Sequence, residues 1–253
     1  MTYHFKDKVV WITGASSGIG KSLALKLIEE KAKVVVTARN ANQLQSLYSK
    51  FDNVLVSAGD ITSFEVNQNI VAQAYEIFGG IDCVILNAGS AEYIDIDHFS
   101  SQPFQRMMET NFLSIVKGIE IALPYLRVSK APYLVGMSSS VAWMGLPQGQ
   151  AYSASKAAIR NLFQGLKIEL APENIAVSWI CPGFIKTPLT DKNTFPMPAR
   201  ITAEEAADII YRKLCQQKTE IHLPKRFTCL LKFISMLPAG WSAKLLKGTV
   251  PAK

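Results

Sequence analysis

The sequence predicts a single-domain, doubly wound α/β fold: a parallel sheet of seven strands with helices on both faces. Seven short apolar runs alternate along the chain with segments whose apolar residues recur at helical spacing. Most of these runs are apolar throughout, which is typical of parallel strands that are buried on both faces. No Pro/Ser/Gly-rich linker and no internal repeat divides the 253 residues, so one domain is expected.

The first half of the chain shows this alternation clearly. The run 9–13 predicts a strand, and a Gly-rich turn leads from it into 19–31, where Leu23, Leu27 and Ile28 lie on one helix face. The elements expected next are a strand at 34–37, a helix at 44–51, a strand at 54–56, a helix at 63–78 and a strand at 83–86.

The second half continues the same pattern. We expect a long helix at 102–127, a strand at 133–137, a helix at 151–171, a strand at 176–180, a helix at 203–216 and a short strand at 221–223. Parallel strands need crossover connections, and the helical segments between the runs supply them.

Composition excludes several classes of protein. With 49% hydrophobic and 19% charged residues, the chain is neither collagen-like nor disordered. Its four cysteines are scattered and form no C-x-x-C pair, so neither a disulfide framework nor a metal site is expected. No apolar stretch precedes the first strand, and no window holds eighteen uninterrupted apolar residues. We therefore expect a cytoplasmic protein without a signal peptide or membrane span.

The positive charge of the chain is concentrated at its end. Of the net charge of +7, residues 1–220 carry only +1, and no acidic residue follows Glu220. No nucleic-acid-binding motif or basic stripe lies elsewhere, so no nucleic-acid partner is expected. The basic residues after Glu220 are Lys225, Arg226, Lys232, Lys244, Lys247 and Lys253.

The Gly-rich turn between the first strand and the first helix is a candidate phosphate site. Glycines permit a tight turn and a close approach of backbone to a pyrophosphate, and the helix N-terminus offers free N–H donors. The turn reads G-x-x-x-G-x-G, and the expected cofactor-binding residues are Gly14, Ser16, Ser17, Gly18, Ile19 and Gly20.

The end of the second strand predicts which dinucleotide binds. An acidic residue there usually accepts from the ribose 2′-hydroxyl of NAD, but this chain has Ala38, Arg39 and Asn40. Ala38 leaves space and Arg39 offers a planar cation suited to a 2′-phosphate. NADP(H) is therefore favoured over NAD(H), the alternative being that Arg39 is only a solvated surface residue.

Further motifs follow in a specific order. Asn87-Ala88-Gly89 follows the fourth strand, Tyr152 and Lys156 form a Y-x-x-x-K pair, and Pro182-Gly183 follows the sixth strand. Together with the first turn, these motifs make residues 9 to 187 resemble the short-chain dehydrogenase/reductase family in its single-domain form.

The resemblance implies roles for particular residues. By it, Asp60 and Ile61 flank the adenine, and Asn111, Ser139, Tyr152 and Lys156 form a catalytic tetrad. Tyr152 follows Ser139 by 13 positions, as in the family. The remaining cofactor-binding residues that it implies are Asn87, Ala88, Gly89, Pro182, Gly183, Ile185 and Thr187.

Elementary chemistry supports an acid/base role for Tyr152. Tyr152 and Lys156 stand at i and i+4 on the helix at 151–171 and share a face. A nearby ammonium and an oxidised nicotinamide both favour phenolate, so we expect the pKa of Tyr152 to be lowered. The phenol could then exchange a proton with a carbonyl or alcohol oxygen.

Ser139 and Asn111 are the remaining members of the tetrad. Ser139 could donate a hydrogen bond to the substrate oxygen. Ser138 and Ser140 lie on the opposite face of an extended segment, so the register alone decides between them. Asn111 is a poor helix former within a helical segment. It could distort the local hydrogen bonding and hold a water that relays protons to Lys156. The alternative is that Asn111 is a core amide whose hydrogen bonds are all satisfied.

The substrate region is less well specified. Residues 189–201 are expected to form a mobile lid, and residues 91–96 and 141–148 the other walls. Apolar and aromatic side chains there predict a hydrophobic carbonyl or alcohol, with an acyl, steroid-like or aryl group. The side chains expected to line the pocket are Tyr93, Trp143, Met144, Leu146, Phe184 and Phe195.

Residues 225–253 form a basic, amphipathic extension, which Pro238 and Gly240 should break into two pieces. Three interpretations stay open. The segment packs on the domain or on a partner subunit, it makes peripheral membrane contact, or it steers an anionic substrate carrier toward the cleft.

We therefore expect residues 1–224 to form an NADP-binding catalytic domain that interconverts a carbonyl and an alcohol on a hydrophobic small molecule. A homodimer or homotetramer is expected because the family commonly assembles through the helices that carry Asn111 and Tyr152. The alternative is an NADP(H)-binding regulatory protein or membrane-surface scaffold without turnover.

Overall fold

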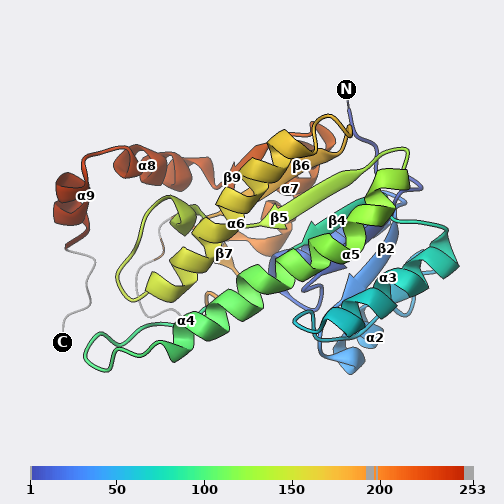
Figure 1. Cartoon of the computed structure of the whole chain (residues 1–253), viewed down its shortest axis with the longest axis horizontal. Helices are drawn as coiled ribbons and strands as arrows, with labels where there is room; N and C mark the ends of the chain where they lie inside the picture. Colours follow the sequence, from blue (N-terminus) through green and yellow to red (C-terminus); the bar gives the residue numbers. More distant parts are fainter. Residues whose placement is uncertain (1, 192–196, 198, 248–253) are drawn as a thin grey trace.

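The centre of the protein is a parallel sheet of seven strands in the order β3-β2-β1-β4-β5-β6-β9 (Figure 1). The computed structural model describes residues 2–191, 197 and 199–247. The predicted fold class is confirmed, and the seven strands lie where the apolar runs predicted them. They are β1 (Val9–Thr13), β2 (Lys33–Thr37), β3 (Val54–Val56), β4 (Cys83–Leu86), β5 (Tyr133–Met137), β6 (Ala176–Pro182) and β9 (Glu220–Leu223).

Both faces of the sheet are buried, which explains the uninterrupted apolar runs. Along β1, Val10 and Ile12 belong to one hydrophobic core, and Val9 and Trp11 belong to a second core on the other face. Side chains alternate between faces along a strand, so a strand between two helical layers needs apolar residues at every position.

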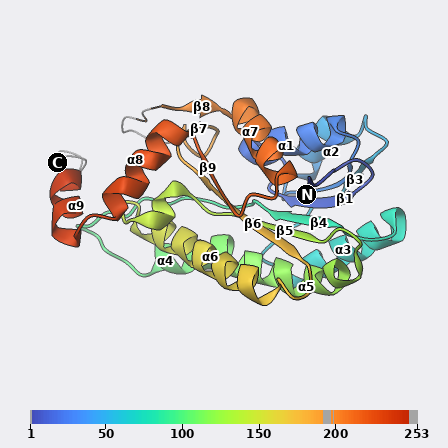
Figure 2. The ribbon, with the colours of Figure 1, turned by 90° about the horizontal axis from the view of Figure 1, so that it is seen from above.

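Helices form a layer on each face of the sheet, as Figure 2 shows. One layer consists of α1 (Gly18–Glu29), α2 (Ala41–Tyr48) and α7 (Ala203–Cys215), whose buried side chains contribute to the core that contains Val10. The other layer consists of α3 (Phe64–Phe78), α5 (Ser114–Val128) and α6 (Gln150–Glu169), whose buried side chains contribute to the core that contains Trp11.

The helix expected at 102–127 is not continuous. It comprises α4 (Gln102–Met107), a π-helical segment η1 (Met108–Leu113) and α5. A π-helical turn adds a residue to the hydrogen-bonded ring and is often found at functional sites. Asn111 lies in this segment, which agrees with the expected local distortion.

Two short elements were not anticipated. A 3₁₀ helix, η2 (Ser140–Trp143), follows β5. A two-stranded sheet pairs β7 (Ile185–Lys186) with β8 (Ile201–Thr202). This pairing joins the two ends of the segment expected to form the lid, while residues 192–196 and 198 of that segment lie outside the described residues.

The sheet topology places a crevice at the carboxyl end of β1. The chain runs from β1 to β2 on one side and returns to β4 on the other. Ligands of open α/β sheets bind where the strand order reverses in this way, outside the carboxyl ends of the strands.

The C-terminal extension forms two helices, α8 (Lys225–Ser235) and α9 (Ala239–Leu246). Pro238 precedes α9 and separates it from α8, as predicted. Gly240 does not interrupt a helix, because it lies in the first turn of α9. Among the described helices, none is both long and apolar enough to cross a membrane, and residues 248–253 of the extension lie outside the described part.

Candidate active site

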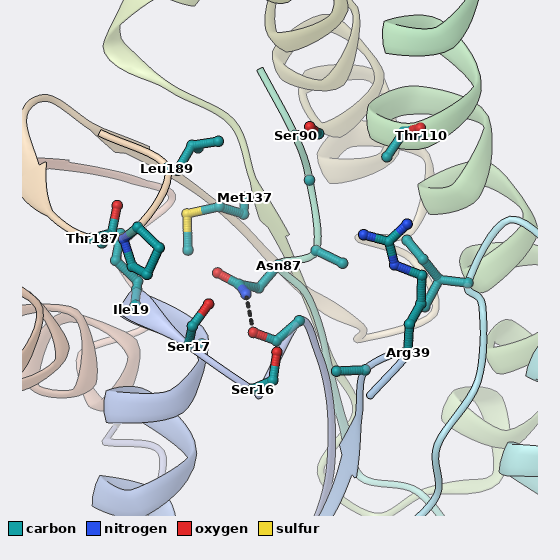
Figure 3. Close-up of a pocket in the computed structure, with 18 of the residues that line it drawn as sticks. Ser16, Ser17, Ile19, Arg39, Asn87, Ser90, Thr110, Met137, Thr187 and Leu189 are labelled. Carbon is teal, nitrogen blue, oxygen red and sulfur yellow. Dashed lines mark hydrogen bonds between the residues drawn. The ribbon is translucent and has the colours of Figure 1, made fainter. Parts of the chain in front are cut away.

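A cavity of about 670 Å³ lies at the carboxyl ends of the strands, and Figure 3 shows part of its lining. It is bordered by the Gly-rich turn, by Arg39 at the end of β2, and by Ser139, Tyr152 and Lys156. All the predicted cofactor-binding residues, from Gly14 to Thr187, line it. Of the predicted tetrad, Asn111 does not reach its surface and is fully buried.

The Gly-rich turn has the geometry that requires glycine. Gly14 and Gly18 have φ values of 71° and 55°, in the left-handed region that glycine adopts without steric cost. A Cβ on Gly20 would lie 2.2 Å from the Gly14 carbonyl oxygen and 2.4 Å from Asn87 Nδ2. Asn87 Nδ2 donates to the Thr13 carbonyl oxygen at 2.9 Å, which joins this turn to the end of β4.

The turn also presents the donors that a pyrophosphate needs. Ser17 is the N-cap of α1, and its side chain makes no capping hydrogen bond to the helix. The first amides of an α-helix have no acceptor inside the helix, and the helix dipole favours an anion beside them. Together with the space that Gly14 and Gly20 leave, these donors fit a dinucleotide.

Arg39 and Asn40 differ in what their side chains do. Arg39 is exposed at the edge of the cavity, and its guanidinium forms no ion pair with another described residue. Asn40 is the N-cap of α2 and accepts from the Gln43 backbone N–H at 3.0 Å. Gln43 in turn donates to the Ser16 carbonyl oxygen at 3.2 Å. Arg39 is thus available to an anionic ligand, whereas Asn40 orders the loop.

Asp60 also lines the cavity. Its carboxylate accepts from the backbone N–H and the hydroxyl of Thr62 at 2.9 and 2.8 Å. These hydrogen bonds hold the pKa of Asp60 below its ordinary value, and the positive charges of Arg39 and Lys117 add to the effect. A carboxylate fixed in this way borders the region expected for the adenine.

Lys156 is a buried cation on α6. Its side chain is almost fully buried, and its Nζ donates to the Met137 carbonyl oxygen at 2.9 Å. The same Nζ lies 5.8 Å from the centre of the Tyr152 ring. Burial lowers the pKa of Lys156 to about 8, because desolvation disfavours the charged form.

The pKa of Tyr152 differs from the expectation. Burial raises this pKa, and a hydrogen bond with Ser139 opposes the rise only in part. Desolvation outweighs the stabilisation of phenolate that the neighbouring groups of the protein provide. The predicted lowering of the pKa by Lys156 is therefore not produced by the protein's own residues.

The three consecutive serines after β5 have separate roles, which the register decides. Ser138 donates to the Lys156 carbonyl oxygen at 2.8 Å and so fixes α6 to the end of β5. Ser140 is buried in η2 and does not line the cavity. Ser139 lines the cavity and hydrogen bonds with Tyr152.

Asn111 joins three segments of the chain. Its Nδ2 donates to the Ser90 carbonyl oxygen and to Ser155 Oγ, both at 2.9 Å, and its Oδ1 accepts from the Ser90 N–H at 2.7 Å. A Cβ on Gly89 would lie 3.1 Å from Asn111 Oδ1 and 3.2 Å from Lys156 Nζ. The amide is therefore a satisfied core amide, and its oxygen also borders the same space as the Lys156 ammonium.

The expected aromatic walls are not part of this cavity. Trp143 donates its indole N–H to Glu220 at 3.0 Å, and the Phe184 ring packs on Phe227 with their centres 4.8 Å apart. Tyr93, Met144 and Leu146 do not line the cavity either, and Phe195 lies outside the described residues. Of the described residues in the walls expected from the sequence, only Leu189 and Thr190 at the start of the lid segment line this cavity, and no residue of 91–96 or 141–148 does.

Several lining residues were missed by the sequence reasoning. Gly59, Ser90 and Pro188 directly adjoin predicted site residues, so the sequence could have indicated them. Arg106 and Glu109 reach the cavity only through the packing of segments far apart in the chain. The lining residues that the sequence analysis did not assign to the site are Gln43, Gly59, Thr62, Ser90, Arg106, Glu109, Thr110, Met137 and Pro188.

Comparison with known proteins agrees with this geometry. Residues 8–196 match the family described as short chain dehydrogenase. The chain belongs to this family. An uncharacterized oxidoreductase of Listeria monocytogenes is 35% identical over 75% of this chain and 80% of its own length, and one of Myxococcus xanthus is 29% identical over 90% and 91%.

Solved structures share the fold of this short-chain dehydrogenase. A short-chain dehydrogenase/reductase of Burkholderia phymatum, solved in complex with NAD, superposes with a TM-score of 0.83 at 20% identity, covering 91% of this chain and 93% of that one. A short-chain type dehydrogenase/reductase of Mycobacterium marinum gives a TM-score of 0.80 at 27% identity, covering 89% and 97%. Membership of this family makes the chain an oxidoreductase of the NAD(P)(H)-binding type.

Proposed function

We propose that the protein is an NADP(H)-dependent oxidoreductase that interconverts a carbonyl and an alcohol on a hydrophobic small molecule. The observation that carries this proposal is the convergence of Ser139, Tyr152 and Lys156 with the Gly-rich turn on one cavity. A phosphate-binding turn and a phenol that can exchange a proton are the two parts that hydride transfer to a carbonyl requires.

Tyr152 is the proposed acid/base. In the reductive direction its hydroxyl gives a proton to the substrate oxygen as hydride reaches the carbonyl carbon, and in the oxidative direction the phenolate takes the proton back. Ser139 donates a hydrogen bond to the same oxygen and stabilises the charge that develops there. A bound nicotinamide would supply or accept the hydride, and in its oxidised form its positive charge would favour the phenolate of Tyr152.

Lys156 and Asn111 support this proton transfer. The Lys156 ammonium lies beneath the Tyr152 ring and beside the position proposed for the nicotinamide ribose, which it would hold by a hydrogen bond. Asn111 fixes the Ser90 segment, and its Oδ1 faces the space that the Lys156 Nζ also borders. A water in that space would connect the two groups and return a proton toward Tyr152.

The preference for NADP(H) is proposed from the end of β2. The Arg39 guanidinium is unpaired among the described residues and exposed at the cavity edge, where a 2′-phosphate would lie. The Burkholderia phymatum protein, by contrast, was solved with NAD. The charge and position of Arg39 support the phosphorylated dinucleotide for this chain.

The substrate and the assembly are proposed on wider features. Apolar side chains exposed on the loop before α4, such as Ile96 and Phe99, suit a hydrophobic carbonyl or alcohol. Residues 1–224 would form the catalytic domain and residues 225–253 an extension to it. Apolar surface is exposed on η1, α5 and α6 by Leu113, Val128 and Ile168, which supports a homodimer or homotetramer. We also propose that the protein is cytoplasmic.

Replacement of the proposed acid/base tests the function directly. Tyr152→Phe should abolish NADPH-dependent reduction of hydrophobic ketones while NADPH still binds, as measured by nicotinamide fluorescence. Tyr93→Phe is the matched control, because Tyr93 is the other phenol close enough to affect the pKa of Tyr152, and it should retain turnover. Full activity of Tyr152→Phe would reject the proposed chemistry, and tight NADPH binding with no turnover by the wild type would indicate a regulatory protein instead.

A further inference from the structure

The C-terminal helices present an apolar face that nothing else in the described chain covers. α8 buries Thr228 and Leu231 against the domain, whereas α9 has no buried residue. The outward side chains are large: Phe233 is 60% and Trp241 69% exposed. Leu230, Met236 and Leu245 are also exposed on the same two helices or between them, so the exposed apolar surface comprises several large side chains rather than a single one.

Positive charge accompanies this apolar face. Lys225, Arg226, Lys244 and Lys247 are exposed, and none forms an ion pair with another described residue. Lys232 differs, because its Nζ bonds to Glu220 at 2.8 Å. The cations that face outward are thus available to an external anionic partner.

The extension is joined to the wall of the active-site cavity. A Cβ on Gly183, a cavity-lining residue, would lie 2.7 Å from the Phe227 ring of α8. Lys232 lies 4.8 Å over the centre of the Trp143 ring in η2. These contacts hold α8 against Gly183 and against η2.

A second apolar segment lies at the same end of the molecule. Figures 1 and 2 both show α8, α9 and the loop before α4 projecting from the end toward which the strands run. This loop exposes Ile96 and Phe99, but it also exposes the carboxylates of Asp95 and Asp97, which an anionic surface would repel. Its Ile94 N–H donates to the Gln148 carbonyl oxygen at 2.8 Å, so it is held beside the segment that follows η2.

Charge decides which partner suits this surface. A second copy that paired its own α8 and α9 with these helices would set positive charge against positive charge, since no acidic residue follows Glu220. Large apolar side chains flanked by lysines are the combination that binds the surface of an anionic bilayer, where the rings enter the headgroup region and the cations remain at the phosphates.

We propose that α8 and α9 dock on the surface of an anionic lipid bilayer, with the cavity mouth directed toward the lipid. A hydrophobic substrate would then enter from the membrane. The docking itself does not rest on the proposed oxidoreductase activity, because it follows from the exposed side chains alone.

Flotation of the full chain with vesicles tests the proposal without any substrate. Vesicles of phosphatidylcholine with about 30 mol% phosphatidylglycerol present an anionic surface and should carry the protein to the top of the gradient. Vesicles of pure phosphatidylcholine should carry much less of it. Phe233→Ser with Trp241→Ser should lower partitioning by at least about tenfold. Lys225→Gln with Lys244→Gln should lower it by about 25-fold, at about fivefold per charge, and this second effect should shrink in high salt.

Matched variants at the other end of the molecule separate docking from misfolding. Ile77 on α3 is 58% exposed, and Ile77→Ser should float as the wild type does; Lys130→Gln is the corresponding charge control. Unchanged flotation of the α8 and α9 variants, or no flotation of the wild type, would overturn the proposal. If the same variants instead dissociate an oligomer measured by light scattering, a second copy covers this face and the membrane proposal is wrong.

Discussion

Removal of the Arg39 guanidinium should weaken NADPH binding selectively. Arg39 stands at the carboxyl end of β2, lines the cavity and makes no ion pair with another described residue. Arg39→Ala therefore removes a free cation without breaking a contact that stabilises the fold. Because NADH lacks the 2′-phosphate, its affinity should stay unchanged.

The size of the effect follows from the exposure of the side chain. Hydrogen bonds to charged groups contribute about 1.5–3 kcal/mol, and exposed ion pairs contribute less because water screens them. Arg39 lies at the open edge of the cavity, so about 1–2 kcal/mol is expected. This corresponds to a loss of about 5- to 30-fold in NADPH affinity, and the loss should diminish as salt is raised.

Titration of nicotinamide fluorescence with NADPH and with NADH measures this selectivity. Arg106→Ala is the matched control: Arg106 also lines the cavity, but its guanidinium is held by Glu92 through hydrogen bonds of 3.0, 3.2 and 2.8 Å. That variant should change the affinities for both cofactors alike. Equal losses for NADPH and NADH in Arg39→Ala, or no loss at all, would refute the assignment of the 2′-phosphate to Arg39.

Three further outcomes are expected from the site geometry. Burial lowers the pKa of Lys156 from 10.5 to about 8, so between these pH values the unfolded chain binds the proton more tightly than the folded chain does. The free energy of unfolding, measured with urea, should therefore rise by about 3 kcal/mol from pH 8 to 10.5. The variant Lys156→Met should lack this rise. Asn111→Ala leaves the Ser90 N–H and carbonyl without their hydrogen-bond partner, so it should lower the free energy of unfolding by about 2–5 kcal/mol. An unchanged midpoint of urea unfolding would contradict these contacts. Gly20→Ala places a Cβ 2.2 Å from the Gly14 carbonyl oxygen, so cofactor binding should be lost by fluorescence titration, whereas Gly165→Ala, with open space around the Cβ, should bind normally.

The order of elements and the identity of the phosphate turn could be predicted from the sequence because both depend on local properties. In β1 the four residues from Val9 to Ile12 are apolar because both faces of the sheet are covered. Gly14 and Gly18 are needed where φ is positive, whatever surrounds the turn. The i, i+4 spacing of Tyr152 and Lys156 places them on one helix face without reference to the rest of the chain.

Packing between distant segments decided the rest. The register after β5 determined that Ser139, rather than Ser138 or Ser140, faces Tyr152. Desolvation raised the pKa of Tyr152 against the expected direction, because burial depends on every segment packed around the phenol.

The sequence by itself determined the alternation of strands and helices, the phosphate turn and the candidate catalytic pair, since each is a property of residues close together in the chain. Only the tertiary structure decided that Trp143 turns from the cavity to Glu220 and that the apolar side of α8 and α9 faces outward. The physical reason is that a side chain's direction and solvation are fixed by contacts between segments far apart in sequence, such as η2 with β9 and α8, which no local pattern records.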